Sequence, residues 1–476
     1  MRSRLTFASA FAAALLAGCA TAPEPTSDEV QAQALGHVEV PQGWRTGANA
    51  APVEAGWLAT FGDPQLEALV AEALEHNPDL AIAAARMEQA EAQVDLATAQ
   101  LKPAIGILGR AGSKPVSDLV AMLSGVMLRV AWEIDLWGRM RYARNAAMAS
   151  RDASSADWRF ARQSLAASVA RTWFLATETA QQAKLANRMA EDAERLTGLA
   201  DDRLRIGAGN ETDVLAARAS AANYRDAARQ VELAHRQALR ALETLVGRYP
   251  AAAIAAREDL VPFPGPVPAG MPADALDRRP DLLAAERRVA AAFDLVGEAK
   301  ASFWPTLTLS GGYGRVSRDA INVQRNITQN TASASATTVI PLYTGGMLTG
   351  QVRLRTAEQR EAVANYARLA LQALDEVESA LDAEATLATR EELLRVSAED
   401  SRRAAGLTET SYRIGKSDLR DVMGRQLSAN ASEVALLAVR RERLVRRVDL
   451  HLALGGDFVA AAPPTTGETP GPGEAR

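Results

Sequence analysis

Two long stretches without proline constrain this 476-residue chain more than any other feature. They run from residue 138 to 206 and from residue 346 to 414, and both are rich in alanine, leucine, arginine and glutamate. At about 1.5 Å per residue, roughly 69 helical residues extend about 100 Å. Ordinary globular helices are much shorter. The sequence therefore predicts a mainly α protein built around two long helices.

Both stretches end in the same tripeptide, Arg205-Ile206-Gly207 and Arg413-Ile414-Gly415. Since glycine commonly ends a helix, Gly207 and Gly415 are predicted turn glycines. A shorter helical pattern follows each turn, to about residue 246 and residue 454. Apolar residues at alternating spacings of three and four predict that each long helix and its return helix form an antiparallel coiled coil. They are Ala166, Val169, Trp173 and Ala176 in the first stretch and Val363, Tyr366, Ala370 and Ala373 in the second.

The chain is an internal tandem duplication. Pro78-Asp79-Leu80 recurs as Pro280-Asp281-Leu282, and Pro103 recurs at the same spacing as Pro305. Each copy is predicted to contain a helix, a β-hairpin, a long helix and a return helix. The copies occupy residues 56–248 and 278–456, and the segment 249–277, rich in proline and alanine, is predicted to link them.

Alternating residues predict two β-hairpins, over residues 105–136 and 306–343. In the first, Val126, Leu128, Val130 and Trp132 alternate with largely polar residues. In the second, Leu307, Leu309 and Tyr313 alternate with small or polar residues, and small residues occupy the last predicted strand, from Ala332 to Tyr343. Strands of this length with two unlike faces are typical of transmembrane barrels; a soluble periplasmic hairpin is the alternative. Four strands cannot close around an open lumen. If they cross a membrane, several chains must contribute, and three chains give twelve strands.

The N-terminus resembles a lipoprotein signal. Arg2 and Arg4 precede an apolar run over residues 5–17, which suits a signal peptide over residues 1–18. Leu16-Ala17-Gly18-Cys19 resembles the bacterial lipobox, in which the cysteine is lipidated; an incidental cysteine beside another cleavage site is the alternative. Residues 19–55 are predicted to be a lipidated, extended leader, and residues 457–476 a disordered tail. Asp63 is predicted to cap a helix that begins at Pro64.

The sequence contains no recognisable catalytic motif. It lacks a nucleophile elbow and a phosphate loop, and its four histidines have no metal-ligand spacing. The prediction is a protein that is not an enzyme, with no metal site and no cofactor other than the covalent lipid on Cys19. The net charge of −5 and the absence of a basic block argue against a nucleic-acid partner.

The two turns share further residues. Asn210 and Ser417 are candidate helix N-caps, and Asp213-Val214 matches Asp421-Val422. An aspartate in the first turn of a helix stabilises the positive end of the helix dipole, which is one sufficient reason for these residues. If several chains surround a pore, the aspartates would also form an acidic ring that selects cations and gates the pore. The sequence leaves both readings open.

The sequence resembles the TolC-like outer-membrane factors, specifically the NodT-type lipoproteins of RND efflux systems. The resemblance covers about residues 54–456. The motifs that carry it are the lipobox, Trp57 with Phe61-Gly62-Asp63-Pro64, Asn77-Pro78-Asp79-Leu80, Trp132-Glu133-Ile134-Asp135-Leu136-Trp137-Gly138-Arg139, Arg279-Pro280-Asp281-Leu282 and Tyr412-Arg413-Ile414-Gly415.

This resemblance implies a homotrimer in which a twelve-stranded outer-membrane barrel continues into a long α-helical periplasmic barrel. The link 249–277 and the C-terminal end would form an equatorial region. Implied partners are outer-membrane lipid, a periplasmic adaptor and an inner-membrane transporter of the RND class. The implied function is the outer-membrane exit duct of a tripartite efflux system for small toxic molecules or drugs. The alternatives are a type I protein secretion channel and a lipid-anchored structural coiled coil without a pore.

The resemblance also implies a periplasmic gate at the turns. Matching positions assign Asp213, Tyr412 and Asp421 to it, with Asp418 and Arg413 beside them. One position departs from the family pattern, because Gly424 stands where many relatives have a second aspartate. The acidic constriction is therefore expected to be weaker, or to depend also on Asp213 and Asp418.

Overall fold

The computed structural model describes residues 22–46, 51–53, 55–110, 123–318 and 327–459. The predicted signal peptide, Cys19 and residues 460–476 of the predicted tail lie outside the described residues. The chain divides into two compact units. Of the described residues, those within 22–39, 84–157 and 281–369 form the sheet unit, and those within 40–83, 158–280 and 370–459 form the tip unit.

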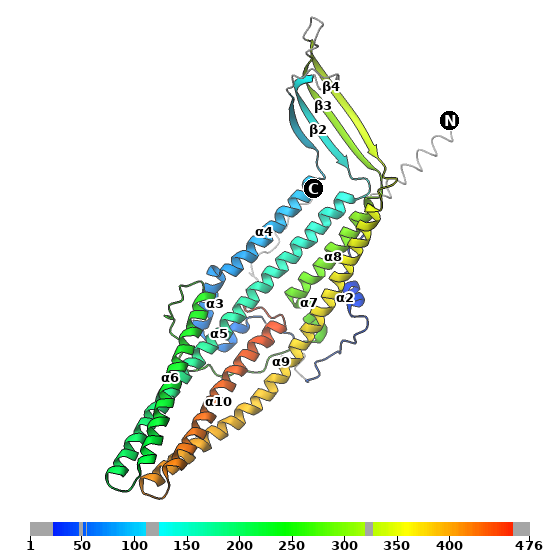
Figure 1. The fold of residues 1–476 in the computed structure, drawn as a ribbon. Coiled ribbons are helices and arrows are strands. Elements are labelled where there is room, and N and C mark those ends of the chain that lie inside the picture. Colours follow the sequence, from blue (N-terminus) through cyan, green and yellow to red (C-terminus); the bar gives the residue numbers. More distant parts are fainter. Residues whose placement is uncertain (1–21, 47–50, 54, 111–122, 319–326, 460–476) are drawn as a thin grey trace, which may run out of the picture. The chain divides into compact units, whose positions relative to one another are not determined.

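Two long helices dominate the fold. Helices α5 (Arg139–Arg205) and α9 (Met347–Arg413) each contain 67 residues. The return helices α6 (Glu211–Leu245) and α10 (Leu419–Ala453) contain 35 residues each (Figure 1). Helices α4 (Pro78–Ala99) and α8 (Pro280–Ala301), which precede the hairpins, have 22 residues each. The equal lengths confirm the duplication and the mainly α class with a small β part.

The four strands form one antiparallel sheet in the order β1-β2-β3-β4. Strands β1 (Ala104–Arg110) and β2 (Leu123–Ile134) form the first hairpin, and β3 (Thr306–Arg318) and β4 (Ile327–Val339) form the second. The two hairpins join through β2 and β3, which pair from Leu123 opposite Arg318 to Ile134 opposite Leu307. None of the helices in the described part of the chain combines the length and apolar character of a membrane span.

The sheet has two unlike faces. The register places Ile107, Leu128, Tyr313 and Ala332 in one cross-strand row, so their side chains share a face. The neighbouring row contains Leu108, Met127, Gly314 and Thr331 on the opposite face. The first face also carries Ile105, Val126, Val130, Trp132 and Leu309, whereas the second carries Arg129, Glu133, Ser310, Ser333 and Ser335. One face is therefore largely apolar and the other is rich in small and polar residues.

Two strands end earlier than the sequence predicted. The second hairpin was expected to reach Tyr343, but β4 ends at Val339, and Pro341 follows it. Proline has no N–H to donate to a strand ladder, which explains the stop. Strand β2 ends at Ile134 because Asp135 turns to the start of α5, where its carboxylate accepts hydrogen bonds from the backbone N–H groups of Met140 and Arg141 at 3.3 and 3.0 Å.

A tryptophan pair fixes the junction between strands and helices in the sheet unit. The indole N–H of Trp137 donates to the carbonyl of Pro305 at 2.9 Å, and its ring stacks on Trp304 with centroids 4.9 Å apart. The indole of Trp132 donates to the carbonyl of Leu101 at 2.9 Å. The segment from Trp132 to Trp137 thus contacts the proline-terminated segment of each repeat, which gives the tryptophan-rich motif a structural role.

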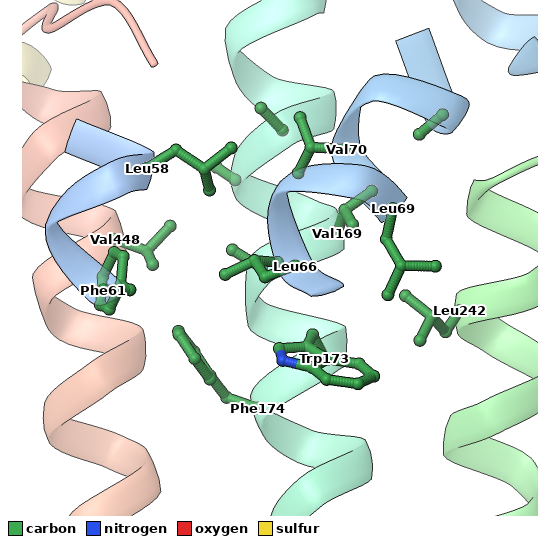
Figure 2. Packing of buried hydrophobic residues seen from close by; sticks show 14 of the residues in the cluster. Leu58, Phe61, Leu66, Leu69, Val70, Val169, Trp173, Phe174, Leu242 and Val448 are labelled. Carbon is green, nitrogen blue, oxygen red and sulfur yellow. The ribbon is translucent and has the colours of Figure 1, made fainter. Parts of the chain in front are cut away.

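The core of the tip unit explains the motif near residue 60. The short helix η1 (Trp57–Phe61) and helix α3 (Pro64–His76) place apolar side chains against α5, α6 and α10. Figure 2 shows Leu66, Trp173 and Phe174 converging in this cluster. Asp63 caps α3, as predicted, through hydrogen bonds from the backbone N–H groups of Gln65 and Leu66. Its second oxygen accepts from the Trp173 indole at 2.9 Å, so the cap also fastens α3 to the long helix.

The link between the repeats packs into the tip unit. It contains helix α7 (Pro272–Arg278). Ile254 and Val261 from the link join the core, and the Phe263 ring lies under the guanidinium groups of Arg443 and Arg447 at 3.8 and 4.4 Å. The link therefore folds against α10 as part of one core.

The leader is not extended throughout, contrary to prediction. Residues Ser27–Leu35 form helix α2, which has a capping box between Thr26 and Glu29. Val30, Ala34 and Leu35 are buried, and the Ser27 hydroxyl donates to Glu286 of α8 at 3.0 Å. The capping box and the three apolar residues outweigh a composition typical of extended segments. In the tip unit, Trp44 is also buried and donates to the Ala269 carbonyl.

The predicted tail also begins too early. Phe458 is buried in the core of the tip unit, and the Asp457 carbonyl accepts a hydrogen bond from the Gly56 N–H at 2.8 Å. An aromatic side chain that fills a core site offsets the polar composition beyond it.

A buried carboxyl group in the sheet unit predicts a pH effect on stability. Asp294 of α8 is 0% exposed, and neither of its oxygens has a hydrogen-bond partner among the described residues. Burial, assisted by nearby Glu24, raises its pKa to about 7. Its neutral form is therefore favoured in the folded protein, and stability is lost as the pH rises from about 4 towards 7.

We expect Asp294→Asn to stabilise the protein at pH 8 by roughly 1–3 kcal/mol and to change little at pH 4, because asparagine stays neutral. The measurement is thermal unfolding followed by circular dichroism across this pH range. Glu298→Gln, at a partly exposed carboxylate on the same helix, is the control and is expected to have little effect. A pH-independent effect of Asp294→Asn would contradict the prediction.

Candidate functional site: the paired turns

The two turns of the tip unit have the same backbone design. Gly207 and Gly415 have positive φ angles of 74° and 75°. In the first turn, the N–H of Gly207 donates to the carbonyl of Leu204, and the N–H of Ala208 donates to the carbonyl of Arg203. In the second turn, the N–H groups of Gly415 and Lys416 donate in the same way to the carbonyls of Tyr412 and Ser411. This is the Schellman ending of a helix, which needs the left-handed conformation that glycine adopts easily. This requirement accounts for the glycine of the repeated Arg-Ile-Gly motif.

Each return helix begins on a side-chain cap. The Asn210 side chain accepts from the Asp213 N–H at 2.8 Å, as predicted. In the second turn the cap is Asp418, which accepts from the Asp421 N–H at 2.8 Å; the prediction of Ser417 was wrong by one residue. Ser417 instead donates to the Asp421 carboxylate at 3.4 Å. Asp418 is the cap because its backbone is extended and it lies three residues before Asp421, from whose N–H it accepts a hydrogen bond.

The two predicted aspartates occupy equivalent positions. Asp213 and Asp421 both lie in the first turn of a return helix, where a carboxylate complements the helix dipole. The Asn210 amide also donates to the Asp213 carboxylate at 3.0 Å. Both carboxylates remain at least partly open to solvent, and Asp418 and Asp421 are exposed.

One apolar cluster packs the two turns against each other. The long helix and return helix of each repeat form a helical hairpin, α5 with α6 and α9 with α10. The cluster contains Leu196, Ala200, Val214 and Ala217 from the first helical hairpin and Tyr412, Leu419 and Val422 from the second. The equivalent pair Val214 and Val422 lies in this cluster, directly after the two aspartates. The cluster therefore holds the aspartate-bearing helix starts of one chain together.

Arg203, which sequence reasoning missed, connects the two hairpins directly. Its guanidinium donates to the Tyr412 carbonyl at 2.6 Å and lies 4.6 Å from the centroid of the Tyr412 ring. Tyr412 is 3% exposed, and burial raises the pKa of its phenol. The predicted gate residue Tyr412 is thus a buried contact between hairpins. A signal was present in the sequence, because Arg203 and Tyr412 are positions at which the two repeats differ.

Arg413 does not take part in this contact. Its side chain is exposed and pairs with Glu409, one turn back on the same helix, at 2.6 Å. Exposed pairs of this kind contribute little to stability. The structure therefore brings Tyr412 and the apolar neighbours of both aspartates together, whereas Arg413 stays on the surface of α9.

An open groove runs between the return helices beside the turns. It has a volume of about 660 Å³ and is lined by both α6 and α10. Asp213 lies on one side and Gly424 on the other. A Cβ atom at Gly424 would meet no other atom within 4 Å, so a larger side chain fits there. Across the described ranges, no group of three or more histidine, cysteine or acidic residues is arranged to hold a metal ion.

Comparison with known proteins gives a consistent result. The family model described as "Outer membrane efflux protein" matches residues 69–248 and 271–456, one match for each repeat. The pyoverdine export outer membrane protein OpmQ of Pseudomonas aeruginosa is 28% identical over 463 residues, covering 93% of this chain and 95% of OpmQ.

Solved structures agree with this match. The outer-membrane channel OprN superposes with a TM-score of 0.79 at 26% identity, covering 88% of this chain and 97% of OprN. The outer membrane protein VceC of Vibrio cholerae superposes with a TM-score of 0.77 at 25% identity, covering 86% of this chain and 100% of VceC. With its duplicated hairpins and paired turns, the chain belongs to the outer membrane efflux protein family.

Proposed function

We propose that this protein is the exit duct through which a tripartite efflux system releases small toxic molecules across the outer membrane. The two-faced sheet carries the proposal. Its apolar face suits contact with lipid, and its face of small and polar residues suits a water-filled lumen. Family membership gives the outer-membrane location and the efflux role.

Assembly follows from the number of strands. A four-stranded sheet cannot enclose an open lumen, whereas three copies supply twelve strands. We propose a homotrimer in which the long helices continue the duct, with Cys19 carrying a lipid anchor. A periplasmic adaptor and an inner-membrane RND-type transporter complete the system. The transporter supplies the energy, and this chain does no chemistry itself.

Efflux is favoured over the alternatives. OpmQ is named for pyoverdine export, and the family description names efflux. Both favour small-molecule export over type I protein secretion. The two-faced sheet argues against a lipid-anchored structural coiled coil without a pore.

Two experiments test this function. The purified full-length protein should conduct ions in planar lipid bilayers, and the gene should restore toxin resistance to its own deletion strain. Crosslinking in intact cells followed by mass spectrometry should recover an adaptor and an RND-type transporter. Recovery of an ABC transporter instead would move the assignment to protein or peptide export. Absence of conductance would refute the duct.

We propose that Asp213 and Asp421 restrict cation passage at the turns. Removing both carboxylates with Asp213→Ala and Asp421→Ala is expected to raise conductance and to weaken block by divalent cations, because an acidic ring binds cations at a constriction. Gly424→Asp, for which there is room, is expected to strengthen the block. Conductance and divalent titrations in planar bilayers measure both effects.

A matched control uses exposed carboxylates on the same hairpins. Asp226→Ala with Asp400→Ala removes the same charge away from the turns and is expected to leave divalent block unchanged. Should the turn variant behave like this control, the aspartates would serve only as helix-end residues.

A further inference from the structure

We propose that Arg203 is a positioning residue that keeps the two turns of one chain together, and that it acts through the main-chain carbonyl and the ring of Tyr412. The phenol hydroxyl of Tyr412 is not needed. The inference rests on the proposed function, because it treats the paired turns as the place where the duct narrows. It adds a residue to which neither the sequence motifs nor the matched turn positions assign a role.

The contact geometry joins three groups at one guanidinium. One terminal nitrogen of Arg203 donates to the Tyr412 carbonyl at 2.6 Å, and the other donates to the Ala208 carbonyl at 3.3 Å. The guanidinium carbon lies 4.6 Å from the centroid of the Tyr412 ring. Arg203 thus binds its own turn and the other hairpin at the same time. A planar group with donors on two nitrogens can do this, whereas a lysine ammonium cannot reproduce the arrangement.

Electrostatics favours a cation at this place. The last carbonyls of a helix lack partners within the helix and carry the negative end of its dipole. Arg203 and Tyr412 lie in the last turns of α5 and α9, so the two negative helix ends converge near one guanidinium. Tyr412 is buried and Arg203 is half-buried, so the cation–π contact and the hydrogen bond are partly sheltered from water, which strengthens both.

The duplication shows that Arg203 is not needed to end a helix. Ser411 takes the equivalent position in the second turn, and its carbonyl accepts the same backbone hydrogen bond as that of Arg203. The second turn therefore closes without an arginine. Leu204 occupies the position equivalent to Tyr412 and is an exposed apolar residue. The two repeats therefore carry different residues at these positions, although their turns are otherwise alike. Because Arg203 and Tyr412 contact each other where the two helical hairpins meet, this difference indicates a role in joining the helical hairpins.

The proposal predicts different outcomes for four variants of the full-length channel. Arg203→Ala is expected to raise the fraction of open time in planar bilayers roughly tenfold, which corresponds to about 1.4 kcal/mol. Tyr412→Ala keeps the main-chain carbonyl but removes the ring and its packing in the apolar cluster, so it should also open the channel. The double variant should be less than additive, because both changes remove the contact between the guanidinium and the ring. Tyr412→Phe should remain as closed as the parent, since the ring and the carbonyl persist. Arg203→Lys should fall between Arg203→Ala and the parent.

Two further measurements separate positioning from folding. The thermal midpoint of Arg203→Ala should stay near that of the parent, while hydrogen exchange should rise at both turns, over residues 203–215 and 411–421. Parent-like gating and exchange in Arg203→Ala would overturn the proposal. Opening of the channel by Tyr412→Phe to the extent seen in Arg203→Ala would also overturn it, because the hydroxyl would then be the essential group.

The parent channel and the aspartate variants distinguish this inference from the function. If the parent conducts and the Asp213 and Asp421 variants alter divalent block while Arg203→Ala has no effect, the duct stands and the Arg203 proposal fails. A parent that does not conduct refutes the duct and, with it, the gating part of this proposal. Exchange at the two turns then decides alone whether Arg203 holds them together.

Discussion

Replacing Leu128 by arginine is expected to prevent the protein from assembling in the outer membrane, whereas arginine at Thr331 is expected to be tolerated. Leu128 lies in the apolar row of the sheet and is 45% exposed in the single chain. Thr331 lies in the neighbouring row on the opposite face, so the two positions are at nearly the same height. The pair tests which face meets lipid.

The expected difference is large because lipid cannot solvate a guanidinium. An arginine on the lipid face of a barrel costs about 2–4 kcal/mol near the bilayer midplane, whereas lumen-facing positions remain hydrated. The Leu128 variant should therefore lose most of its assembled protein from outer-membrane fractions and should not restore toxin resistance. The Thr331 variant should assemble normally and change ion selectivity.

The measurement is the amount of assembled, detergent-resistant protein in purified outer membranes, with total expression as the reference. Equal assembly of both variants would show that the apolar face does not contact lipid. Loss of the Thr331 variant alone would reverse the assignment of the two faces. In either case the proposal of a membrane duct would need a different arrangement of the sheet.

Much of the fold was predictable because its signals are local and occur twice. Helix length follows from the absence of proline, and each turn follows from a glycine with positive φ. The alternating residues predicted the sheet, and the register confirms its two faces. Duplication strengthened each signal, since a pattern that recurs at constant spacing is unlikely to be accidental.

The missed elements depend on tertiary contacts or on competition between neighbouring residues. Helix α2 escaped prediction because proline-rich flanks obscured a short capping box. Phe458 lies beside a polar tail, and only its place in the core fixes it. Ser417 and Asp418 are both good caps, and the backbone conformation decides between them.

The candidate site shows the same limit. Asp213, Tyr412 and Asp421 were predicted as gate residues from the family resemblance at the turns, but a motif does not say what a residue contacts. Arg203 lies in the first repeat and Tyr412 in the second, so their contact depends on how the hairpins pack. The difference between the repeats at these positions was visible, yet without the structure it pointed to no partner.

A second large effect is expected at Glu243, which is a fully buried carboxylate near the end of α6. Glu243 is 1% exposed, and its oxygens accept hydrogen bonds from the backbone N–H groups of Ala252, Ala253 and Ile254 at 2.6, 2.5 and 3.2 Å. These residues begin the link between the repeats, and Ile254 enters the core. One side chain therefore satisfies three backbone donors and fixes the start of the link.

Glu243→Ala is expected to lower the free energy of unfolding by about 3 kcal/mol or more, because it leaves several buried N–H groups without acceptors. Glu243→Gln keeps one oxygen as an acceptor and is expected to cost about 1–2 kcal/mol. Glu72→Ala is the matched control, since Glu72 forms a partly exposed pair with Arg248 nearby and should contribute roughly 0–1 kcal/mol.

The carboxylate also predicts a dependence on pH. Burial alone raises the pKa of Glu243, but the hydrogen bonds from Ala252, Ala253 and Ile254 outweigh it and hold the pKa below its ordinary value. The folded state therefore favours the ionised form. This stabilisation is present above the ordinary glutamate pKa of about 4.3 and is lost as the pH falls through the lower pKa of the folded state. The Gln variant should lack this acid-side loss.

Thermal unfolding in detergent followed by circular dichroism, with hydrogen exchange at residues 252–254, checks these expectations. Glu243→Ala should lose protection at the link before the helices unfold, whereas Glu72→Ala should keep it. If Glu243→Ala instead unfolds like the Glu72 control and keeps its protected amides, another acceptor must replace the carboxylate. The link would then owe its position to the packing of Ile254 and Val261 against the core, and Glu243 would be dispensable for it.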